Sequence, residues 1–222
     1  MRDLVSACTP NSDTTVAGSC NTCEAPIGQT NYCSKCNEPT THAPVDGACE
    51  DVETQADKKA LCTVHTDGAC TECGSTSFLY KGGCYQPNDG KPGQSLCLVA
   101  KGGVCTEAAT GYFVPKGATN TEQSVVACND EAGVAVGGTT YKGVAGCQEC
   151  AAPDAAPGAR AEKVATCTRC QEQKYLKGNA CVDRNLLFHR RKLPHARVNC
   201  AKFSIRNFGC RWILTEEGYL GG

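Results

Sequence analysis

The spacing of the cysteines constrains this chain more than any other feature of its sequence. Residues 70–84 read CTECGSTSFLYKGGC, and residues 167–181 read CTRCQEQKYLKGNAC, so a CxxC pair followed after ten residues by a third cysteine occurs twice. An aromatic residue and a leucine lie at the same place in both copies, as Phe78-Leu79 and Tyr175-Leu176. A unit with so few large apolar side chains cannot bury a core of its own, and cross-links must stabilise it. The repeat predicts short strands or hairpin arms held by cysteines at both ends.

Large apolar residues are scarce over most of the chain. Between Met1 and Val182 there are only nine leucines, isoleucines and phenylalanines, whereas the whole chain of 222 residues carries 20 cysteines, 24 glycines and 10 prolines. This composition is typical of a disulfide scaffold rather than of one domain with a single hydrophobic core. We therefore predict a small disulfide-rich fold: serial cysteine-rich modules of short β-hairpins and loops, extended rather than globular.

The distances between cysteines also indicate a division into modules. Twelve and then seven residues separate the cysteines that begin at Cys49, and the same two distances follow Cys84, which predicts two repeats of about 35 residues, 49–83 and 84–118. The second repeat has Ala108 where the first has the last cysteine of its CxxC pair, Cys73. The predicted organisation is an N-terminal module, the two repeats, C-terminal modules and a divergent tail, at 1–48, 49–118, 119–182 and 183–222.

Charge divides the chain at the same place as the cysteine pattern. Residues 1–182 hold 14 Lys and Arg against 20 Asp and Glu, a net charge of −6, and residues 183–222 hold 8 against 3, a net charge of +5. A mildly acidic body offers no electrostatic footprint for nucleic acid. The tail has no CxxC pair, and Pro194 interrupts its thin apolar face, so we expect it to be poorly ordered, with Cys200 and Cys210 free or paired only with each other.

We interpret the cysteines of residues 1–182 chiefly as structural disulfides, with each CxxC pair contributing to two different bridges at a turn. Closing a loop of ten to fifteen residues contributes about 3 kcal/mol, so several bridges can stabilise a chain that buries little apolar area. The spacing does not determine the connectivity. The candidates are Cys8, Cys20, Cys23, Cys33, Cys36, Cys49, Cys62, Cys70, Cys73, Cys84, Cys97, Cys105, Cys128, Cys147, Cys150, Cys167, Cys170 and Cys181.

Zinc is the alternative role for some of these thiols. Cys147 and Cys150 precede Cys167 and Cys170 at a spacing that suits a four-cysteine structural zinc site. Such a site would leave no open position for catalysis. A redox-active CxxC needs a thiol at a helix N-terminus, and none of the five pairs begins a helical pattern. We also find no Ser/His/Asp arrangement or paired carboxylates, so the sequence predicts no catalytic residue, no cofactor and no small-molecule substrate.

Several stretches resemble the Giardia-type variant-specific surface proteins, a family marked by serial CxxC pairs and the sequence GGCY. The sequence GGCY occurs at 82–85, and further similar stretches are KPGQSLC at 91–97, GYFVP at 111–115, YKGVAGCQEC at 141–150 and KYLKGNAC at 174–181. The resemblance covers about residues 8–183. It implies an extracellular coat protein related to furin-like and growth-factor-receptor cysteine-rich repeats, which would meet host antibodies or other coat proteins. It also implies antigenic variation at the cell surface and no catalytic residues, and the family's link to zinc agrees with the alternative above.

The chain departs from this family at its ends. Family members begin with a signal peptide and end with a transmembrane helix and a CRGKA tail, and we find none of the three in this sequence. The missing CxxC cysteine at Ala108 and the unmatched residues 183–222 are further departures. We therefore expect a truncated or fragmentary member of the family. If the chain instead works inside the cell, the alternative is a zinc-stabilised interaction protein.

Overall fold

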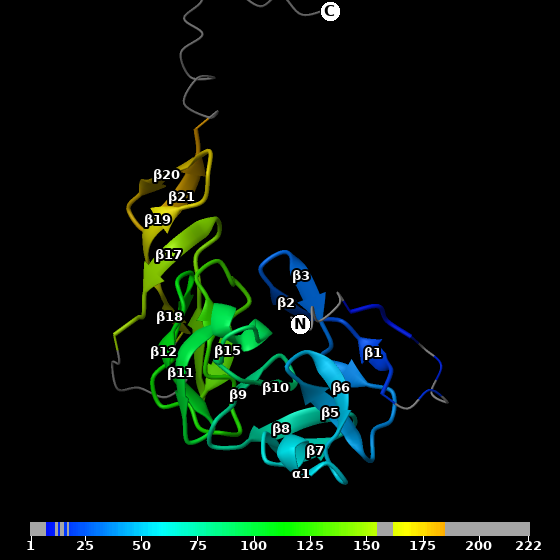
Figure 1. The fold of residues 1–222 in the computed structure, drawn as a ribbon. Coiled ribbons are helices and arrows are strands. Elements are labelled where there is room, and N and C mark those ends of the chain that lie inside the picture. Colours follow the sequence, from blue (N-terminus) through cyan, green and yellow to red (C-terminus); the bar gives the residue numbers. More distant parts are fainter. Residues whose placement is uncertain (1–7, 12, 14–15, 17, 155–161, 185–222) are drawn as a thin grey trace, which may run out of the picture. The chain divides into compact units, whose positions relative to one another are not determined.

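The computed structural model describes residues 8–11, 13, 16, 18–154 and 162–184 (Figure 1). The chain divides into two units, Met1–Val182 and Asp183–Gly222. Only residues 183 and 184 of the second unit are described, so the fold presented below is that of the first. The order predicted for the tail, and the state of Cys200 and Cys210, lie outside the described residues.

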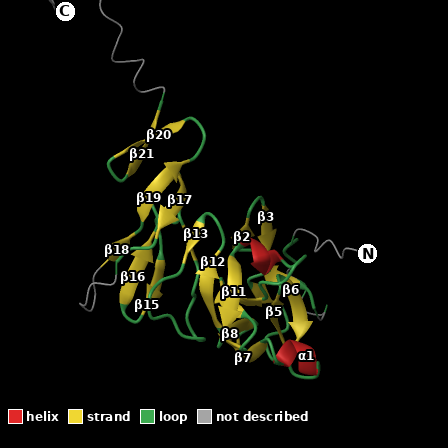
Figure 2. Ribbon diagram, turned by 60° about the vertical axis from the view of Figure 1, so that its left-hand side comes forward, coloured by secondary structure: helices red, strands yellow, loops and turns green. Residues whose placement is uncertain are grey.

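Short β-strands make up nearly all of the regular structure, as the cysteine spacing predicts (Figure 2). The N-terminal half contains β1 Cys20–Thr22, β2 Ala25–Ile27, β3 Thr30–Tyr32, β4 Lys35–Cys36, β5 His42–Val45, β6 Ala48–Asp51, β7 Cys62–Thr66, β8 Ala69–Cys73, β9 Phe78–Tyr80 and β10 Gly83–Tyr85. The remaining strands are β11 Cys97–Lys101, β12 Val104–Ala108, β13 Tyr112–Phe113, β14 Val126–Ala127, β15 Val134–Val136, β16 Thr139–Lys142, β17 Cys147–Ala151, β18 Glu162–Val164, β19 Thr166–Cys170, β20 Lys174–Lys177 and β21 Ala180–Asp183. The described helices are one turn each, α1 Ala56–Lys59 and the 3-10 helix η1 Pro92–Ser95.

One antiparallel pair of strands recurs four times in the described residues. It is formed by β1 with β4, β7 with β8, β11 with β12 and β17 with β19. In the second, third and fourth copies the register is the same, with Cys62 opposite Cys73, Cys97 opposite Ala108 and Cys147 opposite Cys170. We call these copies, with the segment that follows each, unit A (residues 20–49), unit B (62–84), unit C (97–108) and unit D (147–181).

Two-residue turns close most of the hairpins. The β5–β6, β7–β8 and β9–β10 turns are Asp46-Gly47, Asp67-Gly68 and Lys81-Gly82, and both residues of each turn have a positive φ. Such turns match the right-handed twist of the strands, and they favour glycine because it carries no Cβ. The β5–β6 hairpin spans the module boundary that the sequence predicts at residues 48 and 49.

A non-local strand pairing connects unit A to unit B. Strand β10 pairs with β5 in parallel, Cys84 lying opposite Val45, and this joins two hairpins into a four-stranded sheet of order β6-β5-β10-β9. The other described sheets have two strands, apart from the three-stranded sheet β15-β16-β18. Units A and B are therefore connected by backbone hydrogen bonds within one four-stranded sheet.

The buried side chains differ along the chain. Phe78, Tyr80, Tyr85 and Leu96 lie in an aromatic and aliphatic cluster that also contains Val125. The sequence does not predict this cluster, since it is assembled from distant segments. Around unit D the fully buried members of one cluster are all cysteines: Cys128, Cys147 and Cys167. Disulfides therefore replace apolar side chains as the interior of unit D.

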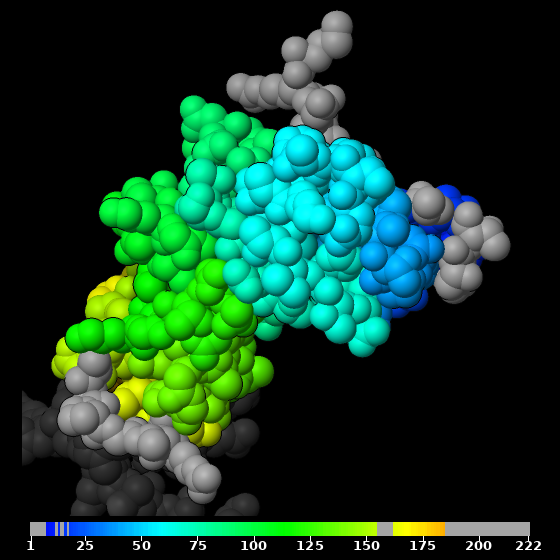
Figure 3. All heavy atoms as spheres, turned by 90° about the horizontal axis from the view of Figure 1, so that it is seen from below, coloured from blue at the N-terminus to red at the C-terminus, as the bar shows by residue number. Residues whose placement is uncertain are grey.

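Glycines in the hairpin turns hold successive units close together. A Cβ placed on Gly68 of unit B would lie 2.4 Å from the carbonyl oxygen of Cys36 in unit A. A Cβ on Gly103 of unit C would lie 2.6 Å from the carbonyl oxygen of Cys73 in unit B. Figure 3 shows the segments around residues 60–80 (cyan) and around 100–130 (green) adjoining on the surface of this part. A side chain at either glycine would separate the backbones of adjacent units.

Candidate functional site: the disulfide clusters

In the structure, the cysteines predicted as disulfide candidates in residues 1–182 form nine bridges. The pairs are Cys8–Cys23, Cys20–Cys33, Cys36–Cys49, Cys62–Cys70, Cys73–Cys84, Cys97–Cys105, Cys128–Cys150, Cys147–Cys167 and Cys170–Cys181. Each of the five CxxC pairs supplies its two cysteines to two different bridges. The two copies of the spacing with ten intervening residues pair alike, as Cys73–Cys84 and Cys170–Cys181.

The bridges follow the register of the repeated hairpin. One bridge in each unit holds the paired strands together. Cys62–Cys70, Cys97–Cys105 and Cys147–Cys167 join the two strands directly, and Cys20–Cys33 joins β1 to the segment just before β4. A second joins the last cysteine of the hairpin to the segment that follows, in units A, B and D. A third reaches back to an earlier cysteine in units A and D, as Cys8–Cys23 and Cys128–Cys150. The units therefore carry three, two, one and three bridges in chain order.

Unit C lacks one bridge because both of its cysteines are replaced. Shifting the sequence of unit B by 35 residues places Cys73 on Ala108 and Cys84 on Thr119. The CxxC pattern reveals the change at Ala108, but Thr119 belongs to no CxxC pair and its change carries no such signal. Since both positions changed, no thiol of this bridge is left unpaired. The same shift places Phe78 on Phe113. Phe78 of β9 pairs with Tyr85 of β10, whereas Phe113 of β13 pairs with Val126 of β14.

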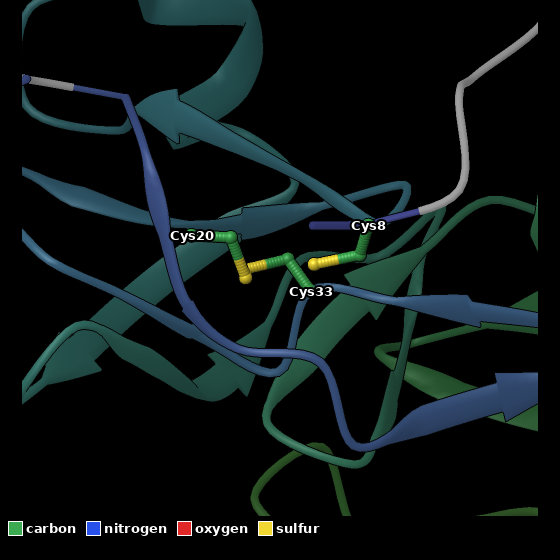
Figure 4. A group of neighbouring side chains, drawn as sticks. All are labelled: Cys8, Cys20 and Cys33. Atoms are coloured by element: carbon green, nitrogen blue, oxygen red, sulfur yellow. A yellow bond between two sulfur atoms is a disulfide. The ribbon is translucent and has the colours of Figure 1, made fainter. Parts of the chain in front are cut away.

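Sulfur atoms of neighbouring bridges lie in contact. The Sγ atoms of Cys33 and Cys49 are 3.3 Å apart, and those of Cys167 and Cys181 are 3.5 Å apart, although each pair belongs to two different bridges. In unit A, the sulfur of Cys8 also lies beside the Cys20–Cys33 bridge, within 4.8 Å of both sulfurs (Figure 4). Further groups of three sulfurs within this distance are Cys33, Cys36 and Cys49, then Cys62, Cys70 and Cys84, then Cys167, Cys170 and Cys181.

One hydrogen bond recurs in all four units and closes each hairpin against the next segment. In unit A the backbone N–H of Cys33, just before β4, donates to the carbonyl oxygen of Gly47 at 3.1 Å. In unit B the N–H of Cys70 in β8 donates to the carbonyl oxygen of Gly82 at 2.9 Å. In units C and D the acceptors are side chains, Ser124 Oγ at 2.8 Å and Asn179 Oδ1 at 2.7 Å. The sequence does not predict that Ser124 and Asn179 accept this hydrogen bond. Their equivalence to Gly47 and Gly82 becomes apparent only when the four units are compared in the structure.

The four cysteines proposed for zinc belong to three different bridges. Cys147 is bonded to Cys167, Cys150 to Cys128 and Cys170 to Cys181. A sulfur in a disulfide carries no thiolate charge, and zinc requires thiolates. Zinc binding by these residues would therefore require their reduction, and it stays a prediction.

The shifted titratable groups of the described residues have structural causes. Burial raises the pKa of Tyr80, Tyr85 and Tyr112, and the Tyr80 hydroxyl donates to the Pro26 carbonyl oxygen at 2.8 Å. Hydrogen bonds from Thr40 and Thr54 lower the pKa of Glu38 and Asp51. A general base needs a raised carboxyl pKa, so none of these shifts prepares a carboxylate for acid–base catalysis.

One open hollow of about 300 Å³ lies beside unit A. It is lined by Thr22, Glu24, Ser34, Lys35, Ala69 and Lys81. Its lining combines polar and oppositely charged side chains with Ala69, and it is open to solvent rather than enclosed. In the part of the chain that the structure describes, we also find no helix long and apolar enough to cross a membrane.

Comparison with known proteins identifies the family to which the chain belongs. Residues 5–186 match the family model described as Giardia variant-specific surface protein. The chain is 57% identical over 181 residues to the major surface-labeled trophozoite antigen 417 of Giardia intestinalis, an alignment that covers 80% of this chain and 25% of that protein. It is 40% identical over 180 residues to the variant-specific surface protein VSP4A1 of the same organism, covering 76% and 25%.

The alignments therefore span about a quarter of the length of these curated relatives. No solved structure matches the chain, so the relation to furin-like and growth-factor-receptor repeats stays a prediction. The family model extends over all four units and their bridges, and on this evidence the chain belongs to the Giardia variant-specific surface protein family.

Proposed function

We propose that this chain is part of a surface antigen that shields the cell and takes part in antigenic variation, without catalytic activity. One relative is named a surface-labeled antigen and another a variant-specific surface protein. The partners of such a chain are host antibodies and other coat proteins. Neither nucleic acid nor a small-molecule substrate is among the proposed partners.

The observation that carries the proposal is the complete pairing of the eighteen cysteines in the described residues. Disulfides persist in oxidising surroundings such as the cell surface, whereas cytosolic thiols are kept reduced. A chain stabilised by covalent bonds between its strands also keeps its fold when it is exposed to a changing medium. These properties suit an outer coat better than an intracellular role.

The hairpins also separate the residues that maintain the fold from those that face outward. In β7 and β11 the first cysteine is buried, while Val64, Leu98 and Val99 are 45–51% exposed. Exposed positions of this kind tolerate substitution within about 0.5 kcal/mol. A scaffold of cysteines and turn glycines can therefore present many different surfaces on one fold, as antigenic variation requires.

Antibody labelling of live cells tests this proposal. Antisera are raised against the oxidised chain, and a matched serum is raised against the reduced and alkylated chain. We expect the first serum to label intact, unpermeabilised cells that make this chain, and to lose most of its binding when the antigen is reduced. Labelling that requires permeabilisation would contradict the surface role.

The alternative is an intracellular protein stabilised by zinc, and two of its four proposed ligands, Cys167 and Cys170, lie in one group of three sulfurs within 4.8 Å of one another. A thiol count on the purified chain under non-reducing, denaturing conditions, combined with metal analysis, separates the two proposals. The surface antigen should show few free thiols and no stoichiometric metal. About one zinc ion per chain together with free cysteines at 147, 150, 167 and 170 would support the alternative.

A further inference from the structure

The last disulfide of unit D is more accessible than its counterpart in unit B. Cys170 and Cys181 are both partly exposed, whereas Cys73 and Cys84 are 2% and 0% exposed. Opening a disulfide requires a thiolate to reach one of its sulfur atoms, so access limits the rate. An external thiol can reach Cys170–Cys181 in the folded chain, but it can reach Cys73–Cys84 only after local opening of unit B.

A second disulfide lies directly beside this accessible bridge. The Sγ atom of Cys181 is 3.5 Å from the Sγ atom of Cys167, which is bonded to Cys147. Cys147 also lies opposite Cys170 in the β17–β19 register. Residues directly opposite in an antiparallel pair have Cα atoms about 4.5–5.5 Å apart, within the range of about 4.4–6.8 Å that a disulfide spans. The four sulfurs can therefore form a second set of bridges, Cys147–Cys170 and Cys167–Cys181.

We propose that Cys170–Cys181 is a thiol-reactive modification site, at which a low-molecular-weight thiol opens the bridge and an exchange then passes to Cys147–Cys167. The external thiolate attacks the sulfur of Cys170, forms a mixed disulfide with it and releases Cys181 as a thiolate. The Cys181 thiolate attacks Cys167, forms Cys167–Cys181 and releases Cys147 as a thiolate.

The cycle closes without an oxidant. The Cys147 thiolate attacks Cys170, forms Cys147–Cys170 and expels the external thiolate that began the sequence. Two disulfides are present before and after, so no electrons are gained or lost, and the small thiol is a catalyst. If the last step is slow, the product that accumulates is a chain with the small thiol attached to Cys170 and with a free thiol at Cys147.

The other units provide internal comparisons. Unit B has the same two bridges and a group of sulfurs within 4.8 Å, but all four of its cysteines are buried. Unit C has the hairpin bridge Cys97–Cys105 but lacks the second bridge, since Ala108 and Thr119 replace its cysteines. Unit A has the 3.3 Å sulfur contact, yet Cys36 of its last bridge is 1% exposed. Unit D alone among the four combines a contact between bridges with a last bridge whose two cysteines are both partly exposed; in unit A it is the first bridge, Cys8–Cys23, whose two cysteines are partly exposed.

Trypsin can distinguish the two sets of bridges. It cleaves after Lys163, Arg169, Lys174 and Lys177, which places Cys167, Cys170 and Cys181 on three different peptides, 164–169, 170–174 and 178–184. In the starting chain peptide 170–174 is linked to 178–184. After exchange, peptide 164–169 is linked to 178–184, and 170–174 is linked to the peptide that carries Cys147.

The experiment treats the oxidised full chain, with Cys200→Ser and Cys210→Ser, with glutathione. Aliquots are quenched in acid, alkylated and mapped without reduction. The two substitutions leave the added glutathione as the nucleophile. We expect Cys170–Cys181 to open at least about tenfold faster than Cys73–Cys84, with glutathione on Cys170 and the 164–169/178–184 linkage appearing in the same time course. Equal opening rates for the two bridges would overturn the proposed site.

A second variant tests the relay without any added thiol. Cys170→Ser leaves Cys181 unpaired beside the Cys147–Cys167 bridge. We expect this variant to isolate with a Cys167–Cys181 bridge and an alkylatable Cys147. If Cys181 is the alkylated residue and Cys147–Cys167 stays intact, the exchange step is wrong, whatever the outcome for glutathione at Cys170.

Discussion

Units B and D both contain a CxxC pair followed after ten residues by a third cysteine, and both form the same last bridge, but only in unit B are the two bridged cysteines buried. In unit B, Phe78 and Leu79 of β9 are 0% and 9% exposed. In unit D, Leu176 of β20 occupies the position of Leu79 and is 42% exposed. The local sequence therefore determines the local structure and the pairing of the cysteines, and it does not determine how deeply the unit lies in the protein.

The neighbouring segments cause this difference. Strand β10 of unit B pairs with β5, and β9 contributes Phe78 and Tyr80 to the cluster that holds Tyr85 and Leu96. Strands β20 and β21 of unit D form a two-stranded sheet of their own. A hairpin in isolation is at best marginally stable in water. We therefore expect unit D to depend on its disulfides, and unit B to depend on both its disulfides and its apolar contacts.

Removal of the equivalent disulfides should have the largest effect. Cys73→Ser with Cys84→Ser and Cys170→Ser with Cys181→Ser open loops of the same length, so each loses about 3 kcal/mol of loop-closure free energy. The first pair also places two hydroxyls in a buried site, which costs about 1–3 kcal/mol more. We expect unit B to be destabilised by more than unit D, measured by native-state hydrogen exchange on peptides from each unit. Equal losses would mean that burial contributes nothing to the difference.

Leucine truncation at the matched positions should come next. Leu79→Ala removes a buried side chain, and we expect a loss of about 2–3 kcal/mol in the free energy of unfolding. Leu176→Ala changes the same chemical group at an exposed site, where we expect less than about 0.5 kcal/mol. Urea denaturation of the oxidised chain, followed by circular dichroism, measures both variants. A comparable loss in Leu176→Ala would show that the β20–β21 hairpin packs against something in solution.

Loss of the hydrogen bond to the Cys167 N–H should have a smaller effect on stability. In unit D, Asn179 accepts a hydrogen bond from the Cys167 N–H at 2.7 Å and donates one to the Ala165 carbonyl oxygen at 2.9 Å. We expect Asn179→Ala to destabilise unit D by about 1–2 kcal/mol, because both backbone groups lose their partner. Asn179→Asp keeps the acceptor for Cys167 and should lose less.

Unit B provides the comparison for this hydrogen bond. Its acceptor is the backbone carbonyl oxygen of Gly82, which no side-chain substitution removes. Hydrogen exchange at the amides of Cys167 and Cys70 should therefore respond differently to the Asn179 substitutions, with faster exchange at Cys167 alone. Unchanged exchange at Cys167 in Asn179→Ala would show that this hydrogen bond contributes little to closing unit D.

The sequence predicted the parts of the structure that depend on neighbouring residues. The cysteine spacing predicted the small disulfide-rich β fold. The parallel pairing of β5 with β10 could not be predicted, because it joins segments whose side chains carry no pairing signal. Nor did the sequence predict the pairing of Cys128 with Cys150, or the equivalence of Asn179 with the carbonyl of Gly82. These features depend on how the units meet.

The smallest predicted effect is a pH dependence of local stability, which we expect in unit B but not in unit D. Glu122 accepts hydrogen bonds from the N–H of Gly137 at 2.8 Å and of Thr119 at 3.2 Å, and the first of these chiefly lowers the pKa of its carboxyl group. The segment it fixes contains Asn120, whose carbonyl oxygen accepts from the Cys73 N–H at 3.0 Å. The charge on Glu122 therefore stabilises the segment that hydrogen-bonds to Cys73, a member of the last bridge of unit B.

The sign of this dependence follows from the lowered pKa. The ionised form is stabilised by folding, so the contribution is complete above the unfolded pKa of about 4.3 and is lost as the pH falls through the lower folded value. Because Glu122 is only partly buried, solvent screens its charge and we expect less than about 0.5 kcal/mol. Hydrogen exchange at Cys73, corrected for the intrinsic pH dependence of exchange, should become faster between pH 5 and pH 3 relative to Cys167. In Glu122→Gln this relative change should disappear, since the amide does not titrate. A change of the same size in Glu122→Gln would assign the pH dependence to another group.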